Sequence, residues 1–298
     1  MGRFFDRFRK KKGENGGGGQ KGPVLYEESG GVTKAQAAAL IQGLAFSPAQ
    51  SPMSVSGGEH DYALISYPGY ILIFFHGDDS HLMKIPFREF MPLECIKDHA
   101  EFYASQGDFH AAAYCIKEGL EQNQDKEDNW GLHYMAGDIF SQLRRMSPDP
   151  KEQKQYLILA YKSYLTSHQC TDCDHKAHAL CKAAAVASIL RDPDLAFALY
   201  NRAMEEEPDN LEVPHDLGGF LWDMGELDKA AEHYFSVLNR DPSYFDTYEE
   251  LSNLFRQLGD TTWPKPFMDC FTQKRPFPAD QLAAAQRDMT ALLAQNQK

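Results

Sequence analysis

The stretch AHALCKAAAVASILRDPDLAFALYNRAMEEEPDN, residues 177–210, is followed directly by LEVPHDLGGFLWDMGELDKAAEHYFSVLNRDPSY, residues 211–244. Identical residues recur at an interval of 34 positions: Ala196 with Ala230, Tyr200 with Tyr234, Pro208 with Pro242, and Gly225 with Gly259. Apolar residues follow a helical spacing within each stretch. A fixed period of this kind predicts an array in which neighbouring helix pairs stack and share a continuous core.

The spacing and the residue types resemble the tetratricopeptide repeat, a family in which two antiparallel helices fill one period. The family has small residues where the two helices cross closely, bulky residues beside them, and a closing proline. The first stretch carries the pattern at Leu180, Ala183, Ala184, Ala187, Ala196, Tyr200, Ala203 and Pro208. The second stretch departs from it only at Pro214 and Val237. Proline is tolerated at 214 because this position falls in the first turn of its helix.

Weaker copies of the pattern extend over residues 93–278, so the resemblance implies a mainly α-helical solenoid of about five helix pairs. In the copy at 130–176, we expect an extra loop of about a dozen residues around residues 144–150. Such a loop would lie between the two helices of that copy.

The last copy begins at residue 245, and its second half contains Pro264 and Pro266. Proline does not fit a helix interior, so the second helix of this copy is expected to be broken. The run 279–295 consists of good helix formers and predicts a terminal capping helix. The solenoid with its cap is therefore expected to occupy residues 93–298.

Residues 1–22 carry seven basic and two acidic side chains and end in a Gly-rich run. This composition predicts a flexible basic tail. Three phenylalanines among residues 1–12 lie on one side of a possible short helix, which allows a weak contact with a membrane surface. A solvated basic tail explains the same residues.

Residues 23–92 alternate strand and turn signals and predict a small α+β domain with an antiparallel sheet. Thr33 is suited to begin a helix that continues to Leu44. A Ser/Pro-rich loop is expected over residues 47–54. The three apolar runs after it, separated by Pro68-Gly69 and by residues 77–80, predict a meander.

The resemblance also implies where a partner binds, because in this family the first helix of each pair lines the concave side of the superhelix. The inward positions are the second, fifth, ninth and twelfth of each repeat. They supply these candidate partner-binding residues: Glu101, Tyr134, Asp138, His178, Glu212, His215, Trp222, Asp246, Glu249 and Asn253. An acidic lining with aromatic interruptions suits a peptide or protein segment that carries basic and apolar residues.

A cluster of Cys170, Cys173, His178 and Cys181 falls within twelve residues and approaches the ligand spacing of a zinc site. Ordinary packing, helix capping or a redox dithiol explains the same residues. Zinc is therefore a possible cofactor, although no cofactor is the expectation. A metal- or redox-responsive regulator is the alternative function.

The net charge of −13 is unevenly distributed, since residues 1–22 contribute about +5 and leave about −18 for the rest. An acidic body argues against nucleic acid as a partner. No stretch is long and apolar enough for a membrane span, and no apolar core of a signal peptide follows the N-terminal basic residues, so a cytoplasmic location is expected.

The sequence contains no Gly-rich phosphate loop, nucleophile elbow or paired-carboxylate motif, and no enzyme activity is expected. The predicted function is a protein–protein interaction scaffold, an adaptor or a chaperone for one client. Its groove would bind a segment of the partner. The partner's identity and the oligomeric state do not follow from the residues.

Overall fold

The computed structural model describes residues 51, 53–57, 60–68, 70–75, 82–86, 93–122, 129–171 and 173–296. The chain divides into two compact units, residues 1–95 and residues 96–298. The predicted tail 1–22, with its membrane-contacting residues, and the predicted helix 33–44 lie outside the described residues.

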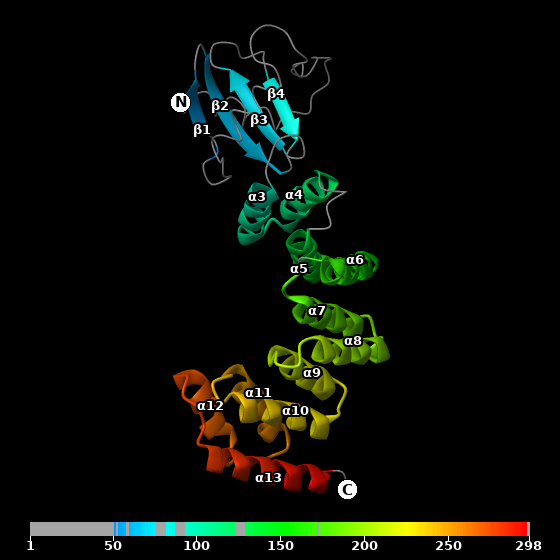
Figure 1. Cartoon of the computed structure of the whole chain (residues 1–298), viewed down its shortest axis with the longest axis vertical. Helices are drawn as coiled ribbons and strands as arrows, with labels where there is room; N and C mark the ends of the chain where they lie inside the picture. Colours follow the sequence, from blue (N-terminus) through cyan, green and yellow to red (C-terminus); the bar gives the residue numbers. More distant parts are fainter. Residues whose placement is uncertain are drawn as a thin grey trace. The chain divides into compact units, whose positions relative to one another are not determined.

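The first unit contains a four-stranded antiparallel sheet in the order β1-β2-β3-β4 (Figure 1). Its strands are β1, Met53–Gly57; β2, His60–Tyr67; β3, Tyr70–Phe75; and β4, Leu82–Pro86. Leu64 of β2 and Ile71 of β3 are fully buried, and the Tyr67 and Tyr70 rings stack with their centroids 5.3 Å apart. The predicted meander is confirmed. The expected loop 47–54 is wrong at its end, because β1 already begins at Met53 and pairs there with Leu64.

The second unit is built from helices that follow one another in pairs (Figure 1). The helices are α3, Leu93–Ser105; α4, Phe109–Gln122; α5, Trp130–Met146; α6, Pro150–Gln169; α7, Lys176–Ile189; α8, Pro193–Glu206; α9, Glu212–Asp223; α10, Leu227–Arg240; α11, Asp246–Gln257; α12, Pro264–Gln273; and α13, Ala279–Asn296. Each odd-numbered helix from α5 to α11 packs against the helix after it, and from α4 to α11 each pair also packs against the next pair. The predicted solenoid of five helix pairs with a capping helix is confirmed.

A small residue faces a tyrosine ring where the two helices of a pair cross. A methyl group on Gly218 of α9 would lie 2.7 Å from the Tyr234 ring of α10. Gly137 of α5 faces the Tyr164 ring of α6 in the same way. These glycines allow the two helix backbones to approach closely, while the tyrosine fills the space beside them.

Four first helices end with the same left-handed turn. The residue in this conformation is Gly107, Arg191, Gly225 or Gly259, and its φ lies between 65° and 82°. At Gly225, the backbone N–H of the glycine donates to Trp222 O, and the next N–H donates to Leu221 O. These bonds satisfy carbonyls that the helix end leaves open. Arg191 is the only one of the four that is not glycine.

Two expectations about individual elements are wrong. Helix α5 continues through residues 144–146 and α6 begins at Pro150, so the extra residues of this repeat lengthen both helices instead of forming a long loop. Helix α12 forms in spite of Pro264 and Pro266. Both prolines fall in its first turn, where a backbone N–H has no helical acceptor to lose.

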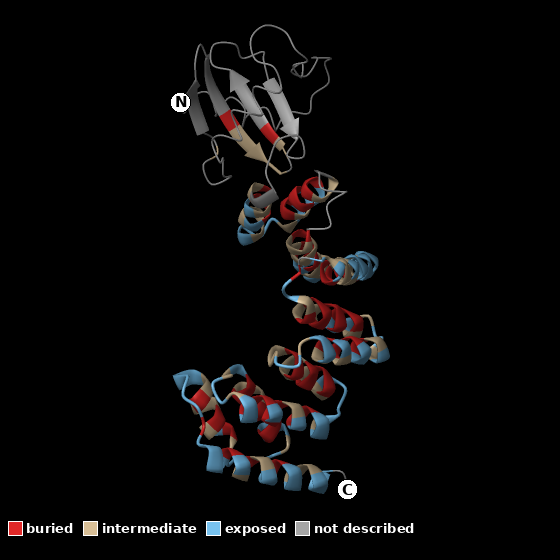
Figure 2. Cartoon of the chain, viewed as in Figure 1, coloured by how far each residue is buried: buried red, intermediate tan, exposed pale blue. Residues whose placement is uncertain are grey.

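One hydrophobic core runs from α6 to α13, and Figure 2 shows its buried residues where neighbouring helices face one another. Helix α13 contributes Leu282, Ala285 and Met289 to this core and leaves polar residues exposed on its other side. The helix therefore covers the apolar end of the array, as a capping helix must. Within the described residues, no helix combines the length and the apolarity that crossing a bilayer requires.

Candidate functional site

Two pockets open along the first helices of the pairs. The pocket between α3, α4 and α5, here called the aromatic pocket, has a volume of about 510 Å³ and is lined by Lys97, Glu101, Ala104, Phe109, Trp130, Gly131, Tyr134, Met135, Asp138, Ile139 and Gln142. The pocket between α7 and α11, here called the acidic pocket, has a volume of about 390 Å³ and is lined by Cys181, Lys182, Ala185, Tyr200, His215, Asp216, Gly219, Trp222, Asp223, Tyr234 and Glu250.

The aromatic pocket contains three of the ten candidate partner-binding residues, Glu101, Tyr134 and Asp138. Helix α5 carries the last two at positions four residues apart, which places them on one face. The Tyr164 hydroxyl of α6 donates a hydrogen bond of 2.6 Å to Asp138 Oδ1. One carboxylate oxygen is thus already engaged within the repeat, and the aromatic and aliphatic surface is the larger part of what this pocket offers.

His178 and Glu212 form a link between repeats. His178 Nδ1 of α7 lies 2.9 Å from Glu212 Oε2 at the start of α9. The hydrogen bond from His178 lowers the pKa of Glu212, so this side chain is a carboxylate at neutral pH. The Tyr134 ring meets the His178 ring edge-on, with centroids 5.4 Å apart. The candidates Tyr134, His178 and Glu212 therefore form one contiguous chain along α5, α7 and α9.

The acidic pocket contains the candidates His215 and Trp222, and one ring nitrogen of each already has a partner. His215 Nδ1 lies 2.9 Å from Thr247 Oγ1 of α11, and Trp222 Nε1 donates to Gln257 Oε1 at 2.6 Å. Burial lowers the pKa of His215, so its ring is neutral at pH 7. Trp222 therefore presents an aromatic surface and His215 adds no charge to the pocket.

The candidates Asp246, Glu249 and Asn253 on α11 line neither pocket. Asp246 is exposed, and its Oδ1 lies 3.6 Å from the Lys274 ammonium. Asn253 Oδ1 accepts a hydrogen bond of 2.9 Å from Arg256. Their role in partner binding stays a prediction.

The charge of the acidic pocket comes from residues outside the ten predicted partner-binding candidates. Lys182, Asp216 and Glu250 occupy the sixth position of their repeats, and Asp223 occupies the thirteenth. On a helix the sixth position lies beside the second and the ninth, which were selected. Burial, together with the negative charge of Glu212, raises the pKa of Asp216 to about 6. Positions six and thirteen each lie four residues after a selected position, the second and the ninth. Including residues at this helical spacing would have identified these side chains.

The four candidate zinc ligands have separate surroundings. Cys170 Sγ donates to Thr166 O at 3.3 Å, His178 is bonded to Glu212, and burial raises the pKa of the Cys173 and Cys181 thiols. Within the described parts of the chain, no group of three or more His, Cys, Asp or Glu side chains is arranged to hold a metal ion. The zinc hypothesis receives no support from this geometry, and the raised pKa values also disfavour reactive thiolates.

Paired helices, small residues at their crossings and pockets along the first helices define an α-helical repeat protein. Residues 190–251 match the family model of the tetratricopeptide repeat. The resemblance seen in the sequence is thereby confirmed for these residues, which run from the end of α7 into α11.

Several solved structures are similar to this chain, among them two tetratricopeptide repeat proteins. One is TTC0263 from Thermus thermophilus, with 17% identity over 55% of this chain and 100% of that chain, at a TM-score of 0.40. Another is YrrB, titled a TPR protein with an unusual peptide-binding site, with 17% identity over 66% and 92% of the two chains and a TM-score of 0.39. BtubC from P. vanneervenii has 19% identity over 62% and 83%, with a TM-score of 0.48. A search of curated proteins found no match.

Proposed function

We propose that this protein is a non-catalytic scaffold or adaptor that binds a peptide or protein segment along the first helices of its repeats. Tetratricopeptide repeats are typically interaction modules, and residues 190–251 match their family model. A chaperone for a single client is one form that this function can take. A cytoplasmic location agrees with the proposal but stays a prediction.

The single observation that carries the proposal is the position of the two pockets. Both lie on the first helices of the pairs, where the family binds its partners, and five of the ten candidate residues line them. The aromatic pocket offers mainly apolar contact, while the acidic pocket contains three carboxylates and one lysine. A partner segment with both apolar and basic side chains complements this combination.

The alternative function is a metal- or redox-responsive regulator centred on Cys170, Cys173, His178 and Cys181. Its support is confined to the spacing of these residues in the sequence. Because Cys173 and Cys181 are both buried, we rank this function below the scaffold.

Selection from a random peptide library displayed on phage tests the scaffold. Selected peptides should be enriched in basic and aromatic residues. They should lose binding to the variant Glu101→Arg/Asp223→Arg, which reverses one exposed charge in each pocket. The variant Asp228→Arg/Glu232→Arg makes the same change in net charge at exposed positions of α10 that line neither pocket. Equal binding by both variants would show that the peptides bind elsewhere.

A further inference from the structure

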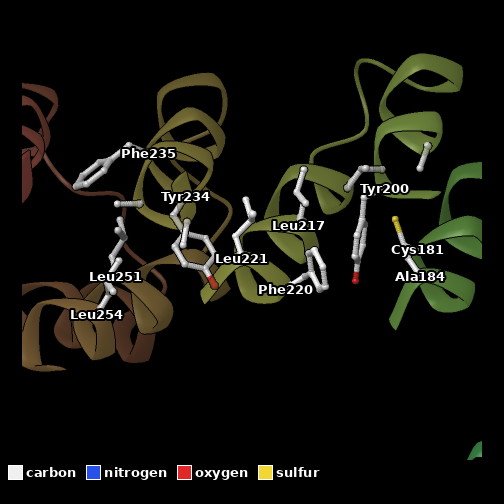
Figure 3. Close-up of a cluster of buried hydrophobic side chains, with 14 of the residues drawn as sticks. Cys181, Ala184, Tyr200, Leu217, Phe220, Leu221, Tyr234, Phe235, Leu251 and Leu254 are labelled. Carbon is white, nitrogen blue, oxygen red and sulfur yellow. The ribbon is translucent and has the colours of Figure 1, made fainter. Parts of the chain in front are cut away.

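Tyr200 and Tyr234 have largely buried rings, and their hydroxyl groups make no hydrogen bond within the described residues. Their side chains are 3% and 1% exposed, and both line the acidic pocket. Among the described residues, neither hydroxyl group makes a hydrogen bond, and neither oxygen is among the fully buried side-chain atoms without a partner, so both hydroxyl groups open onto the pocket. Figure 3 shows both hydroxyl groups pointing to the same side of the helix array.

The equivalent tyrosine of an earlier repeat shows what is missing. Tyr164 donates to Asp138, which occupies the ninth position of its repeat. The ninth position is Ala185 in the repeat of Tyr200 and Gly219 in the repeat of Tyr234, and neither side chain can accept a hydrogen bond. A methyl group on Gly219 would lie 3.6 Å from the Tyr234 hydroxyl oxygen, so this hydroxyl faces the space above Gly219. Because the ninth position of these two repeats has no counterpart of the Asp138 carboxylate, a hollow remains there. The Tyr200 and Tyr234 hydroxyl groups can therefore bond to a ligand.

The pocket around these hydroxyl groups is rich in acceptors. Asp216, Asp223 and Glu250 contribute carboxylates that form no ion pair within the described residues, whereas Lys182 is the single positively charged residue of the lining, since His215 is neutral. The Trp222 N–H is already used by Gln257. A ligand must therefore bring positive charge and several N–H donors.

We infer that the acidic pocket binds an arginine side chain of the partner segment, an assignment that rests on the proposed function. A guanidinium group carries five N–H donors in a planar fork, so it can reach carboxylate and tyrosine oxygens at the same time. Its flat faces also stack on aromatic rings such as that of Trp222. A lysine ammonium has three donors on a point charge and satisfies fewer of these acceptors.

The test uses N-acetyl-arginine N-methylamide as the probe and the full chain as the protein, with dissociation constants measured by ligand-observed NMR. The corresponding citrulline compound has nearly the same shape without the charge. The arginine compound should bind at least about tenfold more tightly than the citrulline compound, and the lysine compound should lie between them. Equal affinities for arginine and citrulline, or no saturable binding of the arginine compound, would overturn the assignment.

Two variants place the probe in this pocket. Tyr234→Phe removes only a hydroxyl and should weaken binding about three- to tenfold, whereas Tyr164→Phe removes the hydroxyl that is bonded to Asp138 and should leave the affinity unchanged. Gly219→Asn fills the hollow and should abolish binding while circular dichroism and the melting temperature show a folded chain. Equal effects of the two tyrosine variants, or wild-type affinity in folded Gly219→Asn, would contradict the inference.

The proposed scaffold function and the arginine site can be tested separately. Peptides that are enriched in lysine or aromatic residues but not in arginine, and that lose binding to Glu101→Arg/Asp223→Arg, would overturn the arginine site alone. Peptides that still bind this variant as well as the wild type would overturn the proposed groove, whatever the probe does.

Discussion

Gly218 and Gly219 are neighbours on α9, yet a methyl group would meet different surroundings at each. At 218 it would lie 2.7 Å from the Tyr234 ring, which is 1% exposed, whereas at 219 its nearest contact is 3.6 Å. Gly218→Ala should therefore destabilise the fold by about 1–3 kcal/mol, as overpacking does. Gly219→Ala should be neutral or stabilising by up to about 1 kcal/mol, because alanine favours the helix. Urea denaturation measures both variants, and equal stabilities would contradict a close helix crossing at Gly218.

Asp216 links stability to pH. Burial raises its pKa from 3.8 to about 6, so the folded chain holds this proton more tightly than the unfolded chain. The contribution of protonated Asp216 to the free energy of unfolding is therefore fully present below pH 4, and it is lost as the pH rises from about 4 to 6. Asp216→Asn should match the wild type near pH 4 and exceed it at pH 7 by roughly 1–2 kcal/mol, after allowance for solvent.

The same substitution at exposed Asp228 is the control for the change in net charge, and denaturation curves at the two pH values provide the comparison. If Asp228→Asn increases the free energy of unfolding at pH 7 as much as Asp216→Asn does, the effect comes from the change in net charge and not from burial of Asp216. A confirmed difference would mean that the pocket retains a carboxylate at a cost in stability, as binding sites commonly do.

Individual residues of the site could be predicted from the sequence only in part. Trp222 and Tyr134 were found because the resemblance fixes the inward positions of each repeat. Asp216 and Glu250 were missed because the pocket also uses the adjacent sixth position. The Tyr200 and Tyr234 hydroxyl groups open onto the pocket because the neighbouring helix has no accepting side chain at the ninth position, and only coordinates reveal that relation.

At the scale of elements, the turn between α7 and α8 carries a residue that its backbone does not favour. Arg191 has a φ of 65°, where the equivalent turns have glycine. Its exposed side chain makes no hydrogen bond or ion pair within the described residues. A left-handed conformation costs a non-glycine residue about 1–2 kcal/mol, and the greater entropy of unfolded glycine offsets part of this. Arg191→Gly should stabilise the fold by about 0.5–1 kcal/mol in urea denaturation.

The reverse change supplies the matched comparison. Gly225→Ala forces a methyl group into the same backbone conformation at φ 81°, where nothing lies within 4 Å of the added carbon. It should cost about 1 kcal/mol through backbone strain alone. A stabilising Gly225→Ala or a destabilising Arg191→Gly would contradict this account of the turn.

Most helices could be predicted from their period, because each repeat uses the same spacing of small and bulky residues. The errors concern the ends of elements. The sequence around residues 144–150 contains two prolines and reads as a loop, but one of them begins α6. The expectation that Pro264 and Pro266 break their helix was wrong for a related reason. Proline destabilises the interior of a helix but not its first turn, where both of these residues lie. Strand β1 escaped notice since MSVSG has too few apolar residues to stand out.

At the scale of the whole molecule, charge determines how fast a basic partner arrives. Residues 1–22 contribute about +5 to a net charge of −13, so the remainder carries about −18. Opposite charges steer association, and a basic tail weakens the attraction that the rest of the chain exerts on a cationic peptide. Removal of residues 1–22 should raise the association rate of an arginine-containing peptide several-fold at low ionic strength. The difference should vanish near 1 M salt, where the screening length is about 3 Å.

Stopped-flow fluorescence at several salt concentrations measures this effect, and two full-length variants separate its causes. Replacement of the seven basic side chains of the tail by glutamine should reproduce the deletion, because only charge is removed. Replacement of Phe4, Phe5 and Phe8 by serine should change nothing. If the phenylalanine variant instead reproduces the deletion and the effect persists in high salt, apolar contacts of the tail, and not long-range charge, control access of the partner to the groove.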